Sequence, residues 1–240
     1  MRAAPDSVNG LGTITKMNLI SGFMRHTKQR GEERDRALTL YVTAVEQARR
    51  PGFYTICGVA DTLDGRFDLI VLHVHLVVRN LRPTGEPGKR LTDLIFKIMM
   101  DDMDMNLREM GVGDLSVGKR VKAMARAFYG RSAAYDAALD GDQADQAGTD
   151  GNAADAADAG ATDADAAEQS LEIVLKRNIY GAEEPEAAQI ACLTTYLRAA
   201  EAALKAEAGE ELVKGAVTFF PAPGEPDGPA GGETASNSAD

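Results

Sequence analysis

The sequence predicts an all-α fold: a single irregular bundle of about six helices, with a disordered acidic insert and a disordered tail. Apolar residues recur at helical spacing in successive segments, which is typical of helices that bury one face. The chain has 240 residues, 44% hydrophobic and 26% charged, which suits one buried core. Residues 141–167 consist almost wholly of Ala, Asp, Gly, Gln and Thr, and this composition cannot bury enough apolar surface to fold.

The chain is expected to begin with an arm and a helix. Residues 1–15 show no apolar periodicity and are predicted to form a flexible arm, followed by the helical core over residues 16–140. The first helix is predicted from Glu33 to a stop before Pro51, because apolar side chains repeat there with helical spacing. These side chains are Leu38, Tyr41, Val42 and Val45.

A loop and a strongly apolar helix come next. Residues 51–65 are expected to form a packed loop, with Asp64 as the N-cap of the following helix. That helix should span about 16 residues and end before Pro83. Its apolar positions are Phe67, Ile70, Val71, Val74, Val77, Val78 and Leu81. The β-branched residues also permit a buried strand, and the length favours the helix. Residues 83–89 are expected to form a turn-rich connection.

Two more helices precede the insert. Residues 91–110 are predicted to form one of them, ended by Gly111 and Gly113 as C′ glycines. The other has an apolar stripe made of Val117, Val121, Met124 and Phe128. Its opposite face carries Lys119, Arg120, Lys122 and Arg126. The sequence therefore predicts a basic amphipathic helix at this point.

Helical spacing returns after the insert. Residues 168–214 are predicted to add C-terminal helices to the same domain, the longer one having Pro185 in its first turn. The apolar positions are Leu171, Val174, Leu175, Ile190, Leu193, Leu197 and Leu204. Residues 215–240 are rich in Gly, Pro, Ser and Ala and are expected to form a mostly disordered tail, with residues 217–220 as its candidate for docking.

The charges are distributed unevenly along the chain. The net charge of −11 argues against a general nucleic-acid binder, yet residues 16–135 carry 20 basic and 14 acidic side chains. Residues 136–169 carry 10 acidic and no basic side chains. The acidity is therefore assigned mostly to the appendages, and no sequence-specific nucleic-acid partner is expected.

The sequence predicts a cytoplasmic protein that is at most peripheral at a membrane. Pro5 and Asp6 stand where a signal peptide needs an apolar region. The most apolar stretch, residues 67–78, is shorter than the roughly 20 residues that span a bilayer. Cys57 and Cys192 are 135 positions apart without metal-site spacing, so we expect buried or incidental thiols in a reducing compartment, neither a disulfide framework nor a zinc site.

One segment partly matches a phosphate-binding loop. Residues 113–119 fit GxxxxGK, but Arg120 stands where the Walker A pattern needs the Ser or Thr that binds Mg²⁺. A phosphate loop also follows a strand, whereas a charged helix precedes this segment. We expect instead a turn between two helices, with Asp114 or Ser116 as the cap of the second. The turn residues are Gly111, Gly113, Asp114 and Gly118.

Three aspartates suggest metal sites that the sequence leaves incomplete. Asp102 and Asp104 begin like an EF-hand loop, but Leu107 holds the place of the tight-turn glycine. Together with Asp101 they are similar to the aspartate-rich helices of all-α prenyl-diphosphate enzymes, although Met105 replaces the final aspartate of DDxxD. The alternative function is therefore a Mg²⁺-dependent all-α enzyme that acts on a diphosphate substrate through these three aspartates.

The histidines and possible nucleophiles do not predict an enzyme. His73 and His75 would diverge by about 200° on a helix and could not share one metal ion, whereas on a strand they would share a face. We expect His73 to be semi-buried with its hydrogen bonds satisfied. The serines lack a nucleophile-elbow context, and neither cysteine has a recognisable catalytic partner.

Four segments carry a resemblance to a known family. They are residues 49–54 (RRPGFY), 61–68 (DTLDGRFD), 72–76 (LHVHL) and 106–119 (NLREMGVGDLSVGK), of which the last is the most specific. With them, residues 38–139 resemble the ubiquinol–cytochrome c chaperone family, the bacterial branch of the mitochondrial cytochrome bc1 assembly factors. Residues 171–204 continue the resemblance more weakly. The chain departs from the family in its long Ala/Asp insert and at Ala60, where a proline is expected.

The resemblance implies an all-helical, non-enzymatic chaperone without a cofactor, which holds newly made cytochrome b before haem insertion is complete. It also implies contact with the ribosome near its exit tunnel, and the basic helix suggests attraction to the anionic inner membrane. It does not imply the small partner subunit that mitochondria use. The candidate residues for binding the client or a partner are His73, Arg79, Asp101, Asp102, Asp104, Arg108, Glu109, Lys119, Arg120 and Lys122.

Overall fold

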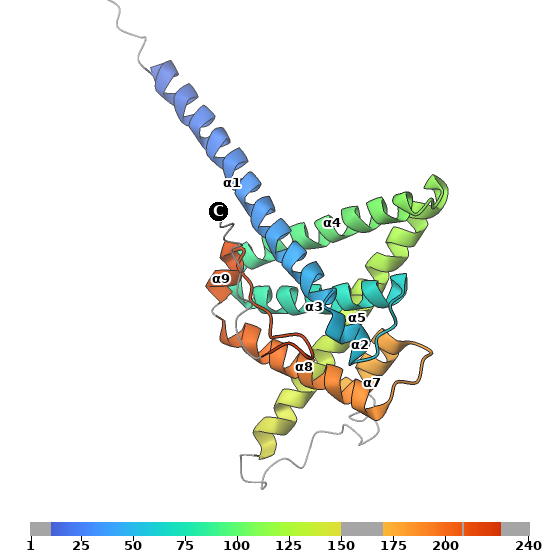
Figure 1. The fold of residues 1–240 in the computed structure, drawn as a ribbon. Helices are drawn as coiled ribbons and strands as arrows, with labels where there is room; N and C mark the ends of the chain where they lie inside the picture. The colour runs from blue at the N-terminus through green and yellow to red at the C-terminus, as the bar shows by residue number, and fades with distance from the viewer. Residues whose placement is uncertain (1–10, 150–169, 208, 227–240) are drawn as a thin grey trace, which may run out of the picture.

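The computed structural model describes residues 11–149, 170–207 and 209–226 (Figure 1). Within these ranges the regular structure is helical and no strand occurs, so the predicted all-α bundle is confirmed. In chain order the helices are α1 (Leu11–Ala48), α2 (Pro51–Thr55), α3 (Leu63–Leu81), α4 (Glu86–Glu109), α5 (Asp114–Thr149), α7 (Leu171–Leu175), α8 (Ala187–Ala206) and α9 (Gly209–Lys214). A 3-10 turn, η1 (Arg82–Thr84), joins α3 to α4, and a π-helical turn, η2 (Lys176–Tyr180), follows α7.

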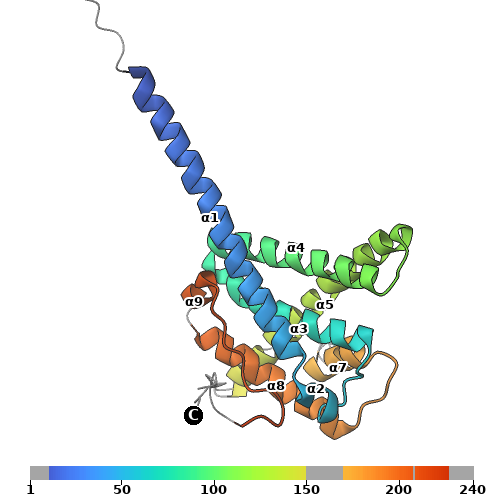
Figure 2. The same cartoon turned by 45° about the horizontal axis from the view of Figure 1, so that its top comes forward.

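Helix α3 lies at the centre of the bundle, packed against α1, α4, α5 and α8 (Figures 1 and 2). Fourteen of its 19 residues are buried. A helix enclosed on every side needs apolar residues on every face, which is why this segment is almost continuously apolar. Of the two possibilities that the sequence left open here, the helix that ends before Pro83 is confirmed.

The start of α3 differs from the prediction in its cap. Thr62 is the N-cap, and its Oγ1 accepts a hydrogen bond from the backbone N–H of Gly65 at 3.1 Å. Asp64, predicted as the cap, lies in the first turn, where its negative charge meets the positive end of the helix. The predicted loop over residues 51–65 also contains a short helix, α2, which begins at Pro51.

The connection between α4 and α5 confirms one predicted turn glycine. Gly111 follows the last residues of α4 with a φ of +78°, as a C′ glycine does. Helix α5 begins immediately after Gly113, whose carbonyl oxygen accepts hydrogen bonds from the N–H groups of Ser116 and Val117. The predicted turn between the two helices is therefore present at residues 110–113. Asp114, Ser116 and Gly118 lie within the first turns of α5, so the prediction was wrong about the cap and about Gly118.

The first, fourth and fifth helices begin earlier or end later than predicted. Helix α4 begins at Glu86, so the second half of the predicted turn-rich connection over residues 83–89 is helical. Helix α1 begins at Leu11 and not near Glu33, so the last residues of the predicted arm are helical, and the N-terminal half of α1 extends away from the other helices (Figures 1 and 2). Residues 1–10 of the arm lie outside the described residues. Helix α5 continues to Thr149, into the predicted disordered insert, whose remaining residues 150–167 also lie outside the described residues.

The C-terminal part confirms the predicted helices and changes their boundaries. Helix α8 has Glu186 as its N-cap, in a capping box with Gln189, so Pro185 precedes the cap and does not lie in the first turn. The segment after α9 packs on the bundle as far as it is described: Ala222 is buried, and the Phe219 ring lies 5.4 Å from the His73 ring. Docking of residues 217–220 is therefore confirmed, and the prediction of disorder is wrong for the rest of residues 215–226, which we call the C-terminal strap. Residues 227–240 lie outside the described residues.

Candidate functional site

Three of the four segments that carry the family resemblance meet at one cleft of about 810 Å³. It lies where the end of α1, α2, the start of α3 and the last turns of α4 come together. The lining residues are Arg49, Pro51, Tyr54, Thr55, Asp61, Leu63, Arg66, Phe67, Ile70, Met103, Asn106, Glu109 and Met110. We call this the α2–α4 cleft and treat it as the candidate functional site. The fourth segment, residues 72–76, is buried in the middle of α3.

Two close contacts explain why glycines occur in the segments around the α2–α4 cleft. A Cβ atom at Gly65 would lie 2.1 Å from the carbonyl oxygen of Ala60, so the loop before α3 can approach the helix only at a glycine. A Cβ atom at Gly52 would lie 1.8 Å from the carbonyl oxygen of Pro223, in the C-terminal strap. The two glycines thus let one loop and the strap pack closely against the walls of the cleft.

The cleft is lined by large apolar side chains, including two flexible methionines. Leu63 and Met110 are 46% and 50% exposed at its rim. Phe67, Ile70 and Met103 are nearly buried at its base. Large apolar side chains exposed around a concavity are typical of a binding site, and methionine adapts its shape to different partners. This arrangement can receive an apolar segment of another molecule.

The charged groups of the cleft balance each other. Its lining contains two arginines, Arg49 and Arg66, and two acids, Asp61 and Glu109. The Arg66 Nε donates to Asp61 Oδ1 at 2.6 Å, and this hydrogen bond lowers the pKa of the Asp61 carboxyl. The lining also contains no Ser, Cys or His.

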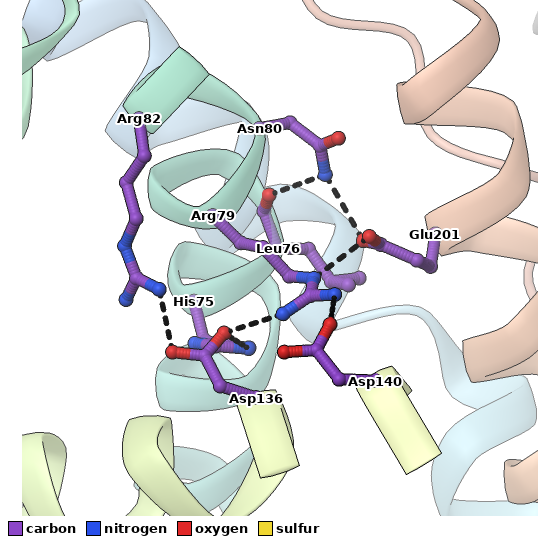
Figure 3. Close-up of polar contacts among 8 residues, drawn as sticks. All are labelled: His75, Leu76, Arg79, Asn80, Arg82, Asp136, Asp140 and Glu201. Atoms are coloured by element: carbon purple, nitrogen blue, oxygen red, sulfur yellow. Dashed lines mark hydrogen bonds and ion pairs between the residues drawn. The ribbon is translucent and has the colours of Figure 1, made fainter. Parts of the chain in front are cut away.

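A second polar cluster joins α3, η1, α5 and α8, with Arg79 and Glu201 largely buried and Arg82 and Asp140 exposed at its edge (Figure 3). Arg79 is at its centre and is 14% exposed. Its Nη1 donates to Asp136 Oδ1 at 2.8 Å, its Nε donates to Glu201 Oε1 at 2.8 Å, and its Nη2 pairs with Asp140. Asn80 Nδ2 donates to Glu201 Oε2 at 3.0 Å, and Arg82 Nη1 donates to Asp136 Oδ2 at 2.5 Å. We call these residues, with His75, the Arg79 network.

The pKa values of three groups in the Arg79 network are shifted, those of Arg79, Asp136 and His75. Burial opposes the charge on Arg79 and Asp136, but the hydrogen bonds between opposite charges outweigh it, raising the pKa of Arg79 and lowering that of Asp136. His75 is fully buried, with its Nε2 3.5 Å from Asp136 Oδ1 and no hydrogen bond to either ring nitrogen among the described residues. Burial lowers the pKa of His75 to about 4, so the ring is neutral at pH 7.

The other candidate histidine, His73, also lies in the core. Its Nδ1 is 2.7 Å from the Leu69 carbonyl oxygen and its Nε2 is 2.9 Å from the Tyr196 hydroxyl, so both nitrogens have partners, as predicted. It is fully buried where a semi-buried side chain was expected. His73 and Arg79 thus stabilise contacts between helices, and neither lines the α2–α4 cleft.

The three aspartates proposed as candidates on α4 each interact with a different residue of the chain. Asp102 accepts a hydrogen bond from the Tyr41 hydroxyl at 2.6 Å, which ties α4 to α1. Asp101 pairs with Lys97, and Asp104 pairs with Arg108, which also reaches Asp114. Glu109 is the fourth acidic candidate on α4, and it lines the cleft, whereas the three aspartates do not. Over the described ranges, no group of three or more His, Cys, Asp or Glu side chains is placed to hold a metal ion.

The basic candidates form an exposed face of α5. Lys119, Arg120 and Lys122 are exposed, as is Arg126, and none of the four has an ion pair with a described residue. The predicted apolar stripe points inward: Val117 and Phe128 are buried, and Val121 and Met124 are partly buried. We call Lys119, Arg120, Lys122 and Arg126 the basic face.

Sequence reasoning missed much of both polar clusters. Asp61, Arg66 and Tyr54 were noted only within the resembling segments, although they line the cleft. Asp136 and Asp140 were assigned to the acidic appendage, although both pair with Arg79. The sequence does show that Asp136 and Asp140 are four residues apart and so share one face of a helix. This spacing does not reveal that their common partner is Arg79, which is 57 residues from Asp136.

The lengths and polarity of the helices show whether any of them could span a membrane. Over the described ranges, every helix is too short or too polar to serve as a bilayer crossing.

A family model described as ubiquinol-cytochrome C chaperone matches residues 55–148 and 151–219 of this chain. Among curated proteins, the chain is similar to ubiquinol-cytochrome c reductase complex assembly factor 1 of Mus musculus and of Homo sapiens. Each is 27% identical over 133 residues, an alignment that covers 55% of this chain and 45% and 44% of the respective relatives. The chain thus spans about half the length of the curated relatives it matches.

One solved structure is similar over most of the chain. The crystal structure of the Cbp3 homolog from Brucella abortus has a TM-score of 0.64 and 29% sequence identity with this chain. The match covers 85% of this chain and 97% of that one.

Proposed function

The chain belongs to the ubiquinol–cytochrome c chaperone family, and from this premise we propose that it is an assembly chaperone for the respiratory cytochrome bc1 complex. Its client would be newly synthesised cytochrome b, held before haem loading and assembly are complete. The observation that carries the proposal is the α2–α4 cleft, because three separate segments of the family resemblance build its walls. The protein would act by binding and release, without catalysis and without a cofactor.

The chemistry of the cleft supports a membrane-protein client. A membrane protein that has not yet assembled exposes apolar segments flanked by charged residues. The cleft combines exposed Leu63 and Met110 with one Arg–Asp pair at its rim, so it can cover an apolar segment while its charged groups remain in contact with water.

We further propose that the basic face brings the protein to an anionic surface, either the inner membrane or the ribosome near its exit tunnel. Four exposed cations on one helix without described ion pairs support this step. Each basic residue near an anionic membrane adds roughly 1 kcal/mol of attraction. The protein would then work in the cytoplasm at the membrane surface, where a nascent client emerges.

The proposal is tested by deleting the gene and restoring it with variants of the cleft. Leu63→Glu with Met110→Lys places opposite charges in the apolar rim, each with the sign that its helix end favours. We expect this variant to fold but to leave membranes with little assembled, haem-loaded bc1 complex, measured by haem b absorbance and native gels.

Ile173→Glu is the matched control, because Ile173 is 43% exposed on α7 and lies outside the cleft. It should restore bc1 levels fully. Full restoration by the cleft variant would contradict the assignment of the site, and normal bc1 levels in the deletion strain would contradict the function itself.

A further inference from the structure

The two cysteines of the chain, which the sequence treats as unrelated thiols, are neighbours in the structure. Cys57 follows α2 and Cys192 lies in the first half of α8, 135 residues later. Their Sγ atoms are 2.6 Å apart. This separation is only about 0.6 Å longer than a disulfide bond, so little movement is needed to form one.

The two thiols differ in their access to reactants. Cys57 is fully buried, and burial raises the pKa of its thiol, which disfavours a direct reaction with an oxidant. Cys192 is partly exposed and lines a groove of about 420 Å³ between α8 and the C-terminal strap. A small reactant can therefore enter through the groove and meet Cys192 first, with Cys57 directly behind it.

We propose that Cys57 and Cys192 form a reversible, redox-responsive disulfide, for which the co-reactant is a low-molecular-weight disulfide such as oxidised glutathione. The Cys192 thiolate attacks one glutathione sulfur, and the other glutathione leaves as a thiolate. The Cys57 thiol then attacks Cys192 Sγ in the mixed disulfide, and its proton leaves with the second glutathione, which is released as a thiol. The protein loses two electrons and two protons, and oxidised glutathione becomes two molecules of reduced glutathione.

The disulfide would attach the α2 wall of the cleft to α8. Pro51, Tyr54 and Thr55 of α2 line the cleft, and Cys57 follows two residues after Thr55. In the thiol form this region is held to the helices beside it by noncovalent contacts, including a 2.7 Å hydrogen bond from the Tyr180 hydroxyl to the Cys57 carbonyl oxygen. A covalent bond across 135 residues removes more freedom than these contacts do, so oxidation would hold α2 in place. This inference does not depend on what the cleft binds.

Thiol counting on the full chain tests whether the disulfide forms. The reduced protein is treated with oxidised glutathione, unfolded, alkylated with iodoacetamide and weighed by mass spectrometry. We expect the wild type to lose the mass of two hydrogens and to take up no alkyl group. Cys57→Ser should retain one glutathione on Cys192, and Cys192→Ser should keep an unmodified Cys57 that is alkylated only after unfolding.

Either of two results would overturn the proposal: two alkylated thiols in the treated wild type, or a glutathione that stays on Cys192 although Cys57 is present. A second measurement tests whether the disulfide restricts the motion of α2. It compares the oxidised and reduced forms of the wild-type protein. Oxidation should raise the Tm by roughly 10 °C and slow hydrogen exchange of amides 51–57 by on the order of tenfold. Unchanged exchange there would show that the disulfide forms without fixing the wall of the cleft.

Discussion

The α2–α4 cleft and the Arg79 network use the same pair of chemical groups in opposite environments. At the cleft, Arg66 and Asp61 are 57% and 58% exposed, and they pair across a rim that faces solvent. In the network, Arg79 is 14% exposed and its partner Glu201 is 7% exposed. The first pair competes with water and salt for its interaction, whereas water has little access to the second.

This difference in exposure predicts that Arg79 stabilises the fold and that Arg66 can contact a partner. An exposed ion pair contributes under about 1 kcal/mol to stability, because both ions are well solvated when they separate. A buried pair that loses one partner leaves an uncompensated charge in the core. We therefore assign stability to the Arg79 network and recognition to the cleft, and this assignment can be broken by experiment.

The largest expected effect is that of Arg79→Met. The change leaves Asp136 and Glu201 without the central guanidinium, and we expect a loss of about 3–5 kcal/mol in the free energy of unfolding. For a chain of this size the Tm should fall by roughly 10 °C or more. Urea titration measures the loss, with Arg66→Met as the matched control, which should barely shift the urea midpoint because both ions of its pair are exposed. Equal losses in the two variants would show that the network and the rim pair do not differ energetically.

An intermediate effect is expected for His75 at acid pH. Burial lowers the pKa of its ring from the ordinary 6.5 to about 4, so between these values the unfolded state binds more protons than the folded state. The contribution of His75 is fully present above pH 6.5 and is lost as the pH falls towards 4. The groups that face His75 are Asp136, Asp140, Arg79 and Arg82.

His75→Leu removes this titration and is measured by urea unfolding from pH 7 to pH 4. Relative to the wild type, the variant should gain stability as the pH falls, on the order of 3 kcal/mol over the whole window. His73 has the same lowered pKa, and burial raises the pKa of Asp68 to about 6, which acts in the opposite direction. The titrations of His73 and Asp68 occur in both the variant and the wild type, so they cancel when the two free energies of unfolding are subtracted. Parallel stability curves for variant and wild type would show that His75 does not titrate in this window.

The smallest effect on stability is expected for the basic face. Reversal of Lys119, Arg120 and Lys122 to Glu should change the Tm by only a few degrees, because the three side chains are exposed. Binding to vesicles with anionic lipids should nevertheless fall by about a hundredfold or more at low salt, since each lost cation removes roughly 1 kcal/mol of attraction. At high salt the affinities of the variant and the wild type for these vesicles should become similar, because salt screens the attraction. Equal binding at low salt would show that this face is simply solvated, and loss of helical circular dichroism would place it in the core.

Much of the fold could be predicted from local pattern. The apolar run of α3, the glycine after α4 and the stripe of α5 are each encoded within about twenty residues, because helix spacing, caps and stops act over short distances. The start of α1 was not predicted, since residues 11–32 lack a clear apolar stripe. The resembling segments identified the region of the cleft before its geometry was known.

The sequence by itself thus determined the helical class, the central helix and the segments that matter for the family. Only the tertiary structure decided which side chains meet: Arg79 with Asp136 and Glu201, Cys57 with Cys192, and the strap with Gly52. These partners are 57 to 171 residues apart, and no local rule of propensity or spacing relates residues so distant. Whether an arginine stabilises the fold or faces a partner depends on how much water surrounds it, and that is set by the packing of the whole bundle.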